Sequence, residues 1–532
     1  MFPHPRDRVN IVMGTVLTFL LALSLYFALS LPPKTYGDGH EYIVQLWALA
    51  SHASPEIRES DIESLSAYLQ DNKLEGFKTT FLSDLKAQIS SGGGKGTYFF
   101  RDLSGRYYGL HFWLYPALCV PAKWVLQAVH ANELKAFQVT NVTFIAFAVA
   151  MVLRSACVSM QRRLTILLLF YGVGISYYFR WPHPEIFSAA ACLVASVAFL
   201  EKRLLVSTFA CGLCAIQNPS AALMIPVIFA SQMDSWLKTT ASGKCKIVGQ
   251  FVLAGGCSLL PFGFYQMMYG TPSLIARERY LLLDNVDLSR MFSLLFDLNQ
   301  GMVVGAGWVM GLAGLGVLMR CFARIDVSHP TERRRLFRRE DWLIAAMALM
   351  ALGVLPQVNW NSGQSVFTRY AFWLCVPLVV WAASQWGNTR LQQWGLRGVI
   401  VMQLLTVYIY GGFSSVDEMS SYIEHKRLPG AVLNYVPWVY NPEPEIFAER
   451  TLGREVDFDT MQKPIVYRWV RDGSIKKILV QADHLEVLSE EVCGRSSALL
   501  TQLGEPIRPS MVRRTRSNFV YISGSFRCFT SQ

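Results

Sequence analysis

The stretch IVMGTVLTFLLALSLYFALSL, residues 11–31, is an uninterrupted apolar segment without a charged side chain. An α-helix needs about 20 apolar residues to cross the hydrocarbon core of a bilayer, so this segment is long enough to span one. It follows Arg6 and Arg8, and it is longer than the apolar part of a typical signal peptide. We therefore predict a retained membrane helix whose N-terminal end lies in the cytoplasm.

Similar apolar segments continue along the chain as far as residue 413. Hydrophobic residues make up 52% of the 532 residues and charged residues only 16%, whereas about a quarter of the residues in a soluble domain are charged. The composition therefore excludes an ordinary soluble globule and a disordered chain. We predict a mainly α, polytopic helical membrane protein, and its further apolar segments are residues 110–129, 136–153, 164–179, 186–200, 204–216, 221–232, 247–268, 302–319, 342–356, 370–384 and 399–413.

The basic residues between these segments predict the orientation of the chain. If every segment crossed the membrane, the basic loop around Arg162 would lie outside. The segment 110–129 contains Pro116, Pro121 and Lys123, so we expect it to lie along the outer interface or to re-enter. The basic loops then face the cytoplasm, and the positive-inside rule selects about eleven spans with the N-terminus inside and the C-terminus outside. Cytoplasmic lipid headgroups account for the net charge of +11, and we expect no nucleic-acid partner.

This topology divides the chain into two predicted domains. Residues 1–413 form the membrane domain. Its first outer loop, residues 32–135, is too long to be only a connection between two spans. Residues 414–532 form a small C-terminal α+β domain on the outer, periplasmic side, with strand-like runs at residues 477–481 and 519–523. No repeat of fixed period is present, which disfavours a transporter built from two matching halves.

The segment YGDGHEY, residues 36–42, follows the first predicted span and carries two acids. Asp38 and Glu41 stand three residues apart, so they share a face if a helix begins here. A carboxylate at an outer membrane surface is well placed to deprotonate a hydroxyl acceptor. The same spacing is typical of a capping box at a helix N-terminus, and the sequence leaves both interpretations open.

Further polar clusters lie in the predicted outer loops, each with a structural alternative. The clusters YYGLHFW (107–113) and WPHPE (181–185) also fit interfacial side chains at span ends. Arg369 follows the cluster NWNSGQS (359–365) and is the strongest candidate for a phosphate ligand, because a guanidinium matches phosphate oxygens. The candidates from the outer loops are His111, His183, Glu185, Arg279, Asn361, Gln364 and Arg369.

Several other patterns carry no predicted site. Most of the eleven cysteines lie in or beside apolar segments, where they act as small core residues. Only Cys493 and Cys528 lie in the polar tail, where an extracytoplasmic disulfide would be permitted. The glycine-rich stretch at residues 91–97 lacks the Gly-Lys-Ser/Thr order of a phosphate loop, and we interpret it as a flexible link.

Together these features resemble the GT-C fold glycosyltransferases. The resemblance rests on Asp38 and Glu41 after the first span, the long first outer loop, His-Pro-Glu at 183–185, and Gly-Gln-Ser at 363–365 before Arg369. It is closest to bacterial relatives of the protein O-mannosyltransferases and the lipid A aminoarabinose transferase, and it covers roughly the first 410 residues. Protein O-mannosyltransferases carry adjacent Asp-Glu after the first span, whereas Gly39 and His40 intervene here.

The resemblance implies an enzyme of the bacterial inner membrane. Such an enzyme transfers a monosaccharide from a polyprenyl-phosphate donor, such as an undecaprenyl-phosphate sugar, to a periplasmic glycan, lipid or protein acceptor. It implies Asp38 as base and Glu41 as its helper. Donor phosphate ligands would be Arg369, Arg279 and His111, and substrate contacts His183, Glu185, Asn361 and Gln364.

The alternative is a lipid-linked sugar translocase or polysaccharide transporter without covalent chemistry. Such a protein needs polar residues within its spans, but the predicted spans are nearly free of charge. A polyprenyl phosphate is a stabilised leaving group, so we expect no required cofactor, although a divalent cation is compatible with the reaction.

Overall fold

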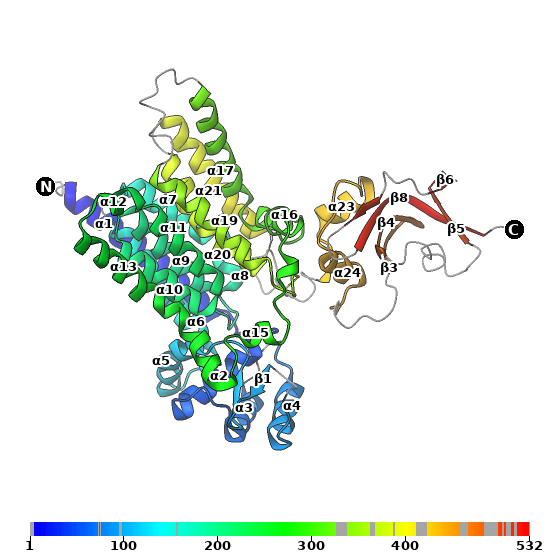
Figure 1. Ribbon diagram of the computed structural model, residues 1–532, viewed down its shortest axis with the longest axis horizontal. Coiled ribbons are helices and arrows are strands. Elements are labelled where there is room, and N and C mark those ends of the chain that lie inside the picture. The colour runs from blue at the N-terminus through cyan, green and yellow to red at the C-terminus, as the bar shows by residue number, and fades with distance from the viewer. Residues whose placement is uncertain are drawn as a thin grey trace. The chain divides into compact units, whose positions relative to one another are not determined.

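The computed structural model has a mainly helical chain with a small β-sheet (Figure 1). Three of the helices described are long and apolar enough to cross a membrane, Glu133–Leu153, Ala241–Tyr269 and Met302–Phe322. The mainly α prediction is confirmed at this level, and the number of about eleven spans stays a prediction. The structure describes residues 5–72, 74, 76–94, 98–155, 158–325, 338–361, 368–386, 389–410, 423–456, 466–482, 498–502, 505–506, 512–514 and 519–530.

The chain forms two compact units. The first unit comprises Met1–Tyr280, Ala306–Val354 and Phe372–Ser415, and the second comprises Leu281–Gly305, Leu355–Ala371 and Val416–Gln532. The α-helices before residue 281 are α1 Pro5–Ser30, α2 Gly39–His52, α3 Glu59–Asp71, α4 Thr79–Ser90, α5 Leu114–Ala128, α6 Ala136–Leu153, α7 Met160–Phe170, α8 Ser176–Tyr178, α9 Glu185–Leu200, α10 Leu204–Gln217, α11 Met224–Ala230, α12 Met233–Lys238, α13 Ala241–Gly256, α14 Leu260–Tyr269 and α15 Leu274–Arg277.

The later α-helices contribute to both units. They are α16 Leu288–Phe296, α17 Met302–Ile325, α19 Trp342–Val354, α20 Arg369–Gln385, α21 Arg390–Ile409, α23 Arg427–Tyr435 and α24 Pro444–Leu452. Short 3₁₀ turns lie at Glu133–Lys135, Pro219–Leu223, Cys257–Leu259, Leu283–Asn285 and Arg339–Asp341, and a π-helical turn lies at Tyr171–Ile175.

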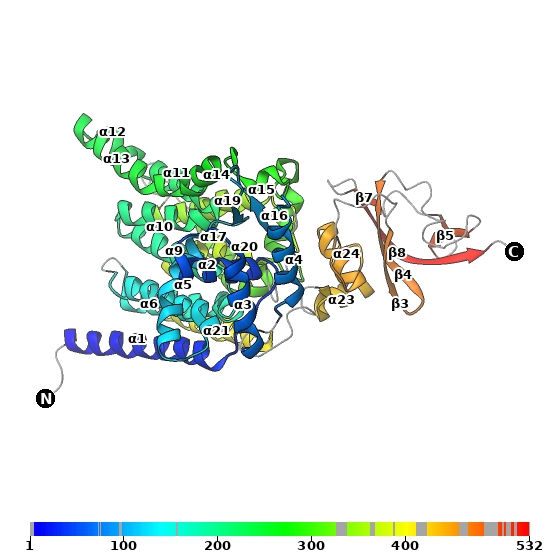
Figure 2. The ribbon, with the colours of Figure 1, turned by 90° about the horizontal axis from the view of Figure 1, so that it is seen from below.

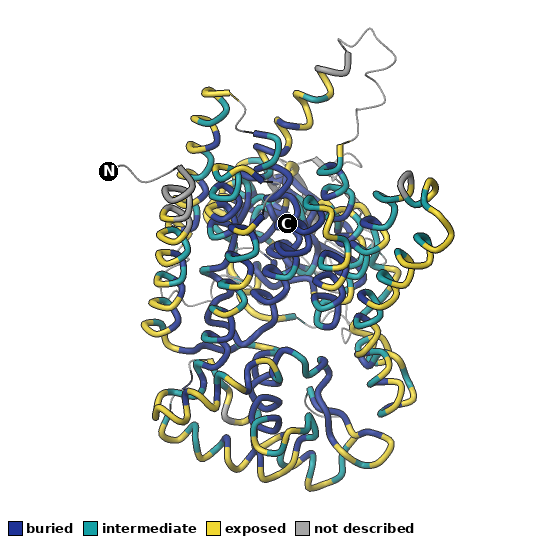
Figure 3. Tube along the Cα trace, turned by 90° about the vertical axis from the view of Figure 1, so that its left-hand side faces the viewer, coloured by how far each residue is buried: buried dark blue, intermediate teal, exposed yellow. Residues whose placement is uncertain are grey.

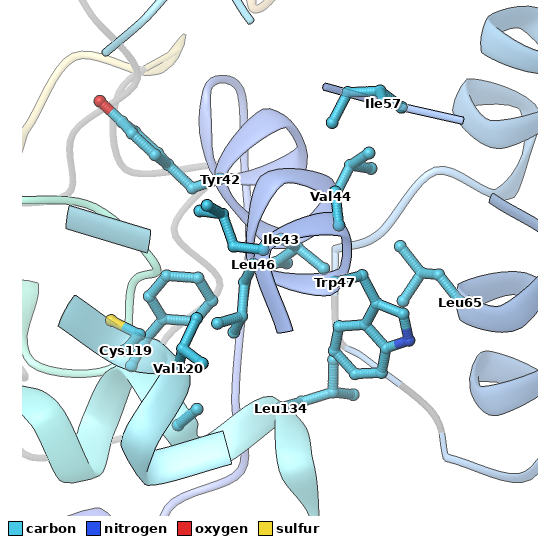
Figure 4. Packing of buried hydrophobic residues seen from close by; sticks show 14 of the residues in the cluster. Tyr42, Ile43, Val44, Leu46, Trp47, Ile57, Leu65, Cys119, Val120 and Leu134 are labelled. Carbon is cyan, nitrogen blue, oxygen red and sulfur yellow. The ribbon is translucent and has the colours of Figure 1, made fainter. Parts of the chain in front are cut away.

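Helix α2 anchors the part of the first unit that follows α1. Every residue from Gly39 to Leu49 is buried, so other segments of the chain surround the helix on all sides. Figure 4 shows Leu46 and Trp47 among side chains from other segments, including Cys119 and Val120 of α5. Burying one large apolar side chain contributes roughly 1.5–3 kcal/mol. The start of α2 is therefore held in a fixed position.

Strands β1 Phe99–Arg101 and β2 Tyr107–Gly109 form a short antiparallel ribbon. The ribbon places the segment that begins at Leu110 beside α2. Tyr107 also forms a bridge with Ile57, so the ribbon is tied to the loop before α3. The hydroxyl of Tyr265 donates to the carbonyl of Leu110 (2.9 Å). These contacts fix the backbone on both sides of Gly109.

The π-helical turn at Tyr171–Ile175 interrupts the helical path from α7 to α8. Gly174 has a φ of 139°, which side chains rarely tolerate, and Gln403 Nε2 donates to the carbonyl of Gly172 (2.8 Å). The chain then passes through Arg180–Pro184 before α9 begins at Glu185. Helix α9 is buried over Glu185–Phe199 apart from Ala191 and contacts α6 and α10, as the burial colouring of Figure 3 illustrates for the interior helices.

The second unit contains a sheet covered on one face by helices. The antiparallel strand order is β3-β4-β8-β5-β6, with β7 also paired to β8. Leu433 of α23 and Phe447 of α24 pack with Leu479 and Tyr521 of the sheet, and Figure 2 shows these helices beside the strands. The predicted strand-like runs at residues 477–481 and 519–523 lie in β4 and β8. The strand bounds are β3 Val466–Arg471, β4 Ser474–Gln481, β5 Ala498–Gln502, β6 Glu505–Pro506, β7 Val512–Arg514 and β8 Phe519–Thr530.

Candidate active site

Asp38 occupies the N-cap position of α2, but its side chain makes no capping hydrogen bond. The capping-box interpretation of Asp38 and Glu41 therefore does not hold in the structure. The Asp38 side chain keeps 18% of its surface exposed, and its Oδ2 atom lies 3.4 Å from His183 Nε2 and 3.9 Å from His111 Nε2. One partly accessible carboxylate thus faces two imidazole rings from segments far away in the sequence.

Glu41 holds His111 on one side of this carboxylate. Glu41 is fully buried, and its Oε1 accepts hydrogen bonds from the backbone N–H of His111 (2.7 Å) and from Gln45 Nε2 (3.0 Å). Its Oε2 lies 2.7 Å from His111 Nδ1. Burial raises the pKa of Glu41, whereas the ion pair with His111 opposes this shift. A substrate therefore cannot reach the Glu41 carboxylate, and Glu41 orients the imidazole of His111.

His183 and Glu185 form a similar pair on the other side. Both are buried, and His183 Nδ1 lies 3.0 Å from Glu185 Oε1, without the angle of a hydrogen bond. The indole of Trp181 stacks on the His183 ring with 4.0 Å between centroids and 10° between planes, while Tyr42 meets that ring edge-on. The ring of His183 is thus held from two directions with its Nε2 toward Asp38.

Gly39 and Gly109 permit the close approach of these segments. A Cβ atom at Gly39 would lie 2.3 Å from Thr35 Oγ1 and 3.0 Å from Pro182 Cγ. A Cβ atom at Gly109 would lie 1.9 Å from Gln45 Nε2 and 2.3 Å from Glu41 Oε1. Cβ atoms essentially never lie within 3.0 Å of another heavy atom, so a side chain at Gly39 would force Thr35 to shift and one at Gly109 would force Gln45 and Glu41 to shift.

We expect Gly109→Ala to separate Glu41 from His111 and to lower the free energy of unfolding by roughly 1–3 kcal/mol, the usual effect of overpacking. Thermal unfolding of the purified protein measures the second effect. Gly249→Ala is the matched control, because nothing lies within 4 Å of a Cβ at that position. Equal melting temperatures for Gly109→Ala and the wild type would contradict this account of the packing.

His40 stands between the two acids in the sequence but serves the local structure. Its Nδ1 lies 2.9 Å from the Gly37 carbonyl, and its Nε2 accepts the backbone N–H of Lys78 (3.1 Å). These partners place the ring proton on Nδ1. Burial lowers the pKa of His40, so the ring stays neutral and fixes the loop before α4.

Two buried cations outside the predicted set lie in the segments that carry Asp38 and His183. Lys34 is 2% exposed and Arg180 is 5% exposed. Arg180 Nε donates to the carbonyl of Pro32 (2.9 Å), which ties the two segments together. The available signal was sequence proximity, since Lys34 precedes Asp38 by four residues and Arg180 precedes His183 by three.

The remaining predicted residues lie in other segments of the chain. Arg279 is exposed just beyond α15. Arg369 begins α20, and its Nη2 donates to the hydroxyl of Tyr370 (3.0 Å) within the second unit. Gln364 lies outside the described residues, as do Gly363 and Ser365. The structure therefore brings together Asp38, Glu41, His111, His183 and Glu185 of the predicted set.

Asn361 belongs to a buried polar network in the second unit. Its backbone N–H donates to Glu445 Oε1 (2.9 Å), and its Oδ1 accepts from Arg450 Nη2 (3.3 Å). Arg450 also donates to Gln300 Oε1 (3.3 Å). Burial raises the pKa of Glu445, and of Glu449, which accepts a hydrogen bond from Asn361. Protein partners in this network occupy the hydrogen-bonding groups of Asn361. The network links the segment before α20 to α24.

His425 belongs to the same network. Its burial predicts that the stability of the second unit depends on pH. Asn299 Nδ2 donates to His425 Nδ1 (3.1 Å), and burial together with Arg450 lowers the pKa of His425 to about 3. Because the folded pKa lies below the unfolded value, the stability from neutral His425 is complete above pH 6.5 and declines as the pH falls toward 3.

Between pH 7 and pH 5, protonation of unfolded His425 should cost the second unit about 2 kcal/mol. We expect His425→Gln to remove this part of the pH dependence, measured by hydrogen exchange of the β4 amides. His130→Gln is the control, because His130 is exposed. The prediction fails if both variants keep the wild-type slope.

Among the described residues, no group of three or more histidine, cysteine, aspartate and glutamate side chains is arranged to hold a metal ion. No protein-family model, curated protein or solved structure matches the chain. A carboxylate flanked by two imidazoles, each beside a buried glutamate, is suited to accepting a proton. The two imidazoles can stabilise the negative charge of the carboxylate.

Proposed function

We propose that the chain is an inner-membrane glycosyltransferase that transfers a monosaccharide from a polyprenyl-phosphate donor to a periplasmic glycan, lipid or protein. The observation that carries this proposal is the approach of His111 Nε2 and His183 Nε2 to the same oxygen of Asp38. The first unit also contains helices suited to a membrane. A base held beside apolar helices fits a reaction between a lipid-linked sugar and a hydroxyl acceptor.

Asp38 takes the acceptor's hydroxyl proton in this proposal. The acceptor oxygen then forms a bond to the anomeric carbon, and the bond between that carbon and the phosphate oxygen breaks. The electron pair leaves with polyprenyl phosphate, and attack from the opposite face inverts the anomeric centre. His111 and His183 balance the charge at Asp38, while Glu41 and Glu185 orient these rings.

The donor phosphate needs cations near the departing oxygen. Lys34 and Arg180 are the nearest candidates along the chain to Asp38 and His183, and guanidinium and ammonium groups stabilise a phosphate anion. We retain Arg369, with Arg279, as a predicted contributor. In this role Arg369→Ala should weaken donor use more than Arg369→Lys does.

The membrane topology in this proposal extends beyond the three capable helices. Shorter apolar helices lie at Gly14–Ser30, Glu185–Leu200, Leu204–Gln217 and Pro219–Ala230. The proposal of about eleven spans, with the N-terminus in the cytoplasm and the C-terminal domain in the periplasm, also rests on the other apolar segments of the sequence and on the basic loops between them. Asp38 follows the first span and would therefore lie at the periplasmic face.

An assay for the release of polyprenyl phosphate from the donor tests this function. Purified protein in vesicles is mixed with a labelled polyprenyl-phosphate sugar and a crude periplasmic acceptor fraction. We expect polyprenyl phosphate to appear together with labelled sugar on the acceptor. Movement of intact donor across the bilayer without its cleavage would instead identify a translocase and would contradict the proposal.

A further inference from the structure

Helix α16 carries an apolar stripe that faces outward. Leu288, Phe292 and Phe296 are spaced four residues apart, so they lie on one face of the helix. Their exposed fractions are 86%, 61% and 42%. The opposite face is fixed, because Arg290 pairs with Glu443 (3.2 Å). The stripe is therefore held outward by contacts of the opposite face.

Helix α23 and the residues after it expose a second apolar stripe. Leu428 is 57% exposed and Tyr435 is 77% exposed on one side of the helix. Trp438 and Val439 continue this surface at 61% and 66% exposure. On the other side, Leu433 is fully buried against the sheet. Tyrosine and tryptophan are enriched where protein meets the lipid headgroup region.

The link between α16 and α17 connects both stripes to a helix that can cross the membrane. Helix α16 ends at Phe296 and α17 begins at Met302, so the link reaches at most about 20 Å. Asp297 Oδ1 accepts the backbone N–H groups of Asn299 (2.8 Å) and Gln300 (3.0 Å), which keeps the link compact. Asn299 Oδ1 also accepts the N–H of Lys426, the residue before α23 (3.0 Å).

We propose that α16 and α23 lie in the headgroup region of the bilayer, with their two stripes inserted among phospholipid acyl chains where α17 enters the membrane. Exposed amphipathic helices beside a span bind this way, because acyl chains receive the apolar face and headgroups the flanking polar residues. Arg427, exposed at the start of α23, adds a cation that suits anionic headgroups. The inference needs α17 to cross the membrane, but it does not depend on glycosyl transfer.

Photocrosslinking in vesicles identifies what covers the stripes. The photoreactive residue p-benzoyl-L-phenylalanine replaces Phe292 or Tyr435 in the full-length protein, reconstituted in phosphatidylethanolamine and phosphatidylglycerol. The same residue in place of Asp472 is the control, because that side chain is 83% exposed in the turn between β3 and β4. An unchanged thermal midpoint shows that each variant is folded.

After illumination, mass spectrometry should find phospholipid adducts at positions 292 and 435 several-fold above the level at position 472. Crosslinked dimers at either position would assign the stripe to a second copy of the chain, and an adduct with another protein added to the vesicles would assign it to a partner. Either result, or lipid adducts no higher than at position 472, would overturn the proposal. Because no sugar donor is present, this outcome is independent of the transferase assay.

Discussion

Asp38→Asn should reduce sugar transfer by roughly 10²–10⁴-fold, the contribution of a positioned general base. The variant should fold normally, because the Asp38 side chain makes no capping hydrogen bond and is partly exposed. An asparagine amide keeps the shape of the side chain but does not take up a hydroxyl proton. Initial rates of polyprenyl phosphate release in vesicles, at saturating donor, measure the effect.

Asp71→Asn is the matched control for this variant. Asp71 is exposed at the end of α3, so its substitution should leave both rate and stability at wild-type values. A rate for Asp38→Asn within a factor of two of wild type would remove Asp38 from the mechanism. A large loss of thermal stability would instead make its role structural.

Glu41→Gln is expected to have the second largest effect, roughly 10²-fold or more on transfer, by analogy with other carboxylates that orient a catalytic histidine. Glu41 accepts from the backbone N–H of His111 and from Gln45 through one oxygen, and contacts His111 Nδ1 through the other. A glutamine has only one acceptor oxygen, so its NH₂ group would face Nδ1, which could then no longer carry a proton. The ring would keep a proton on Nε2 alone and, as a neutral imidazole, would no longer balance the charge at Asp38.

The protonation of the His111 ring separates this positioning role from a structural one. Nitrogen NMR of the labelled ring should show protons on both ring nitrogens in the wild type and on Nε2 alone in Glu41→Gln. Glu63→Gln is the control, because the Glu63 side chain is 60% exposed and pairs with Lys86 at the surface. An unchanged ring together with a full rate would show that Glu41 does not orient His111.

The helical class and several residues of the candidate site were predictable from local signals in the sequence. Apolar segments of span length indicate helices because the bilayer must be crossed with every backbone group bonded. His111 and His183 were candidates because each stands among aromatic residues next to an apolar segment. Their convergence on Asp38 was not predictable, since it depends on packing around α2 and on the passage of Gly109 beside Glu41.

The roles of the buried residues were also hidden in the sequence. Glu41 was expected to help Asp38 directly, but its burial and its contacts with His111 give it an orienting position instead. Asn361 was expected at a substrate, whereas Arg450 and Glu445 bind it within the second unit. A polar residue in a predicted loop carries no local signal that distinguishes a ligand contact from a buried network.

Thiol accessibility directly tests the proposed location of the Asp38 cluster at the periplasmic face. Leu103, 78% exposed in the turn between β1 and β2, is a suitable reporter as Leu103→Cys. The native thiols Cys245 and Cys321 are exposed and lie in or beside loops predicted to be cytoplasmic, so they serve as internal controls. A membrane-impermeant maleimide added to cells with a permeabilised outer membrane should label Leu103→Cys and spare both controls. Labelling of position 103 only after the inner membrane is opened would contradict the account.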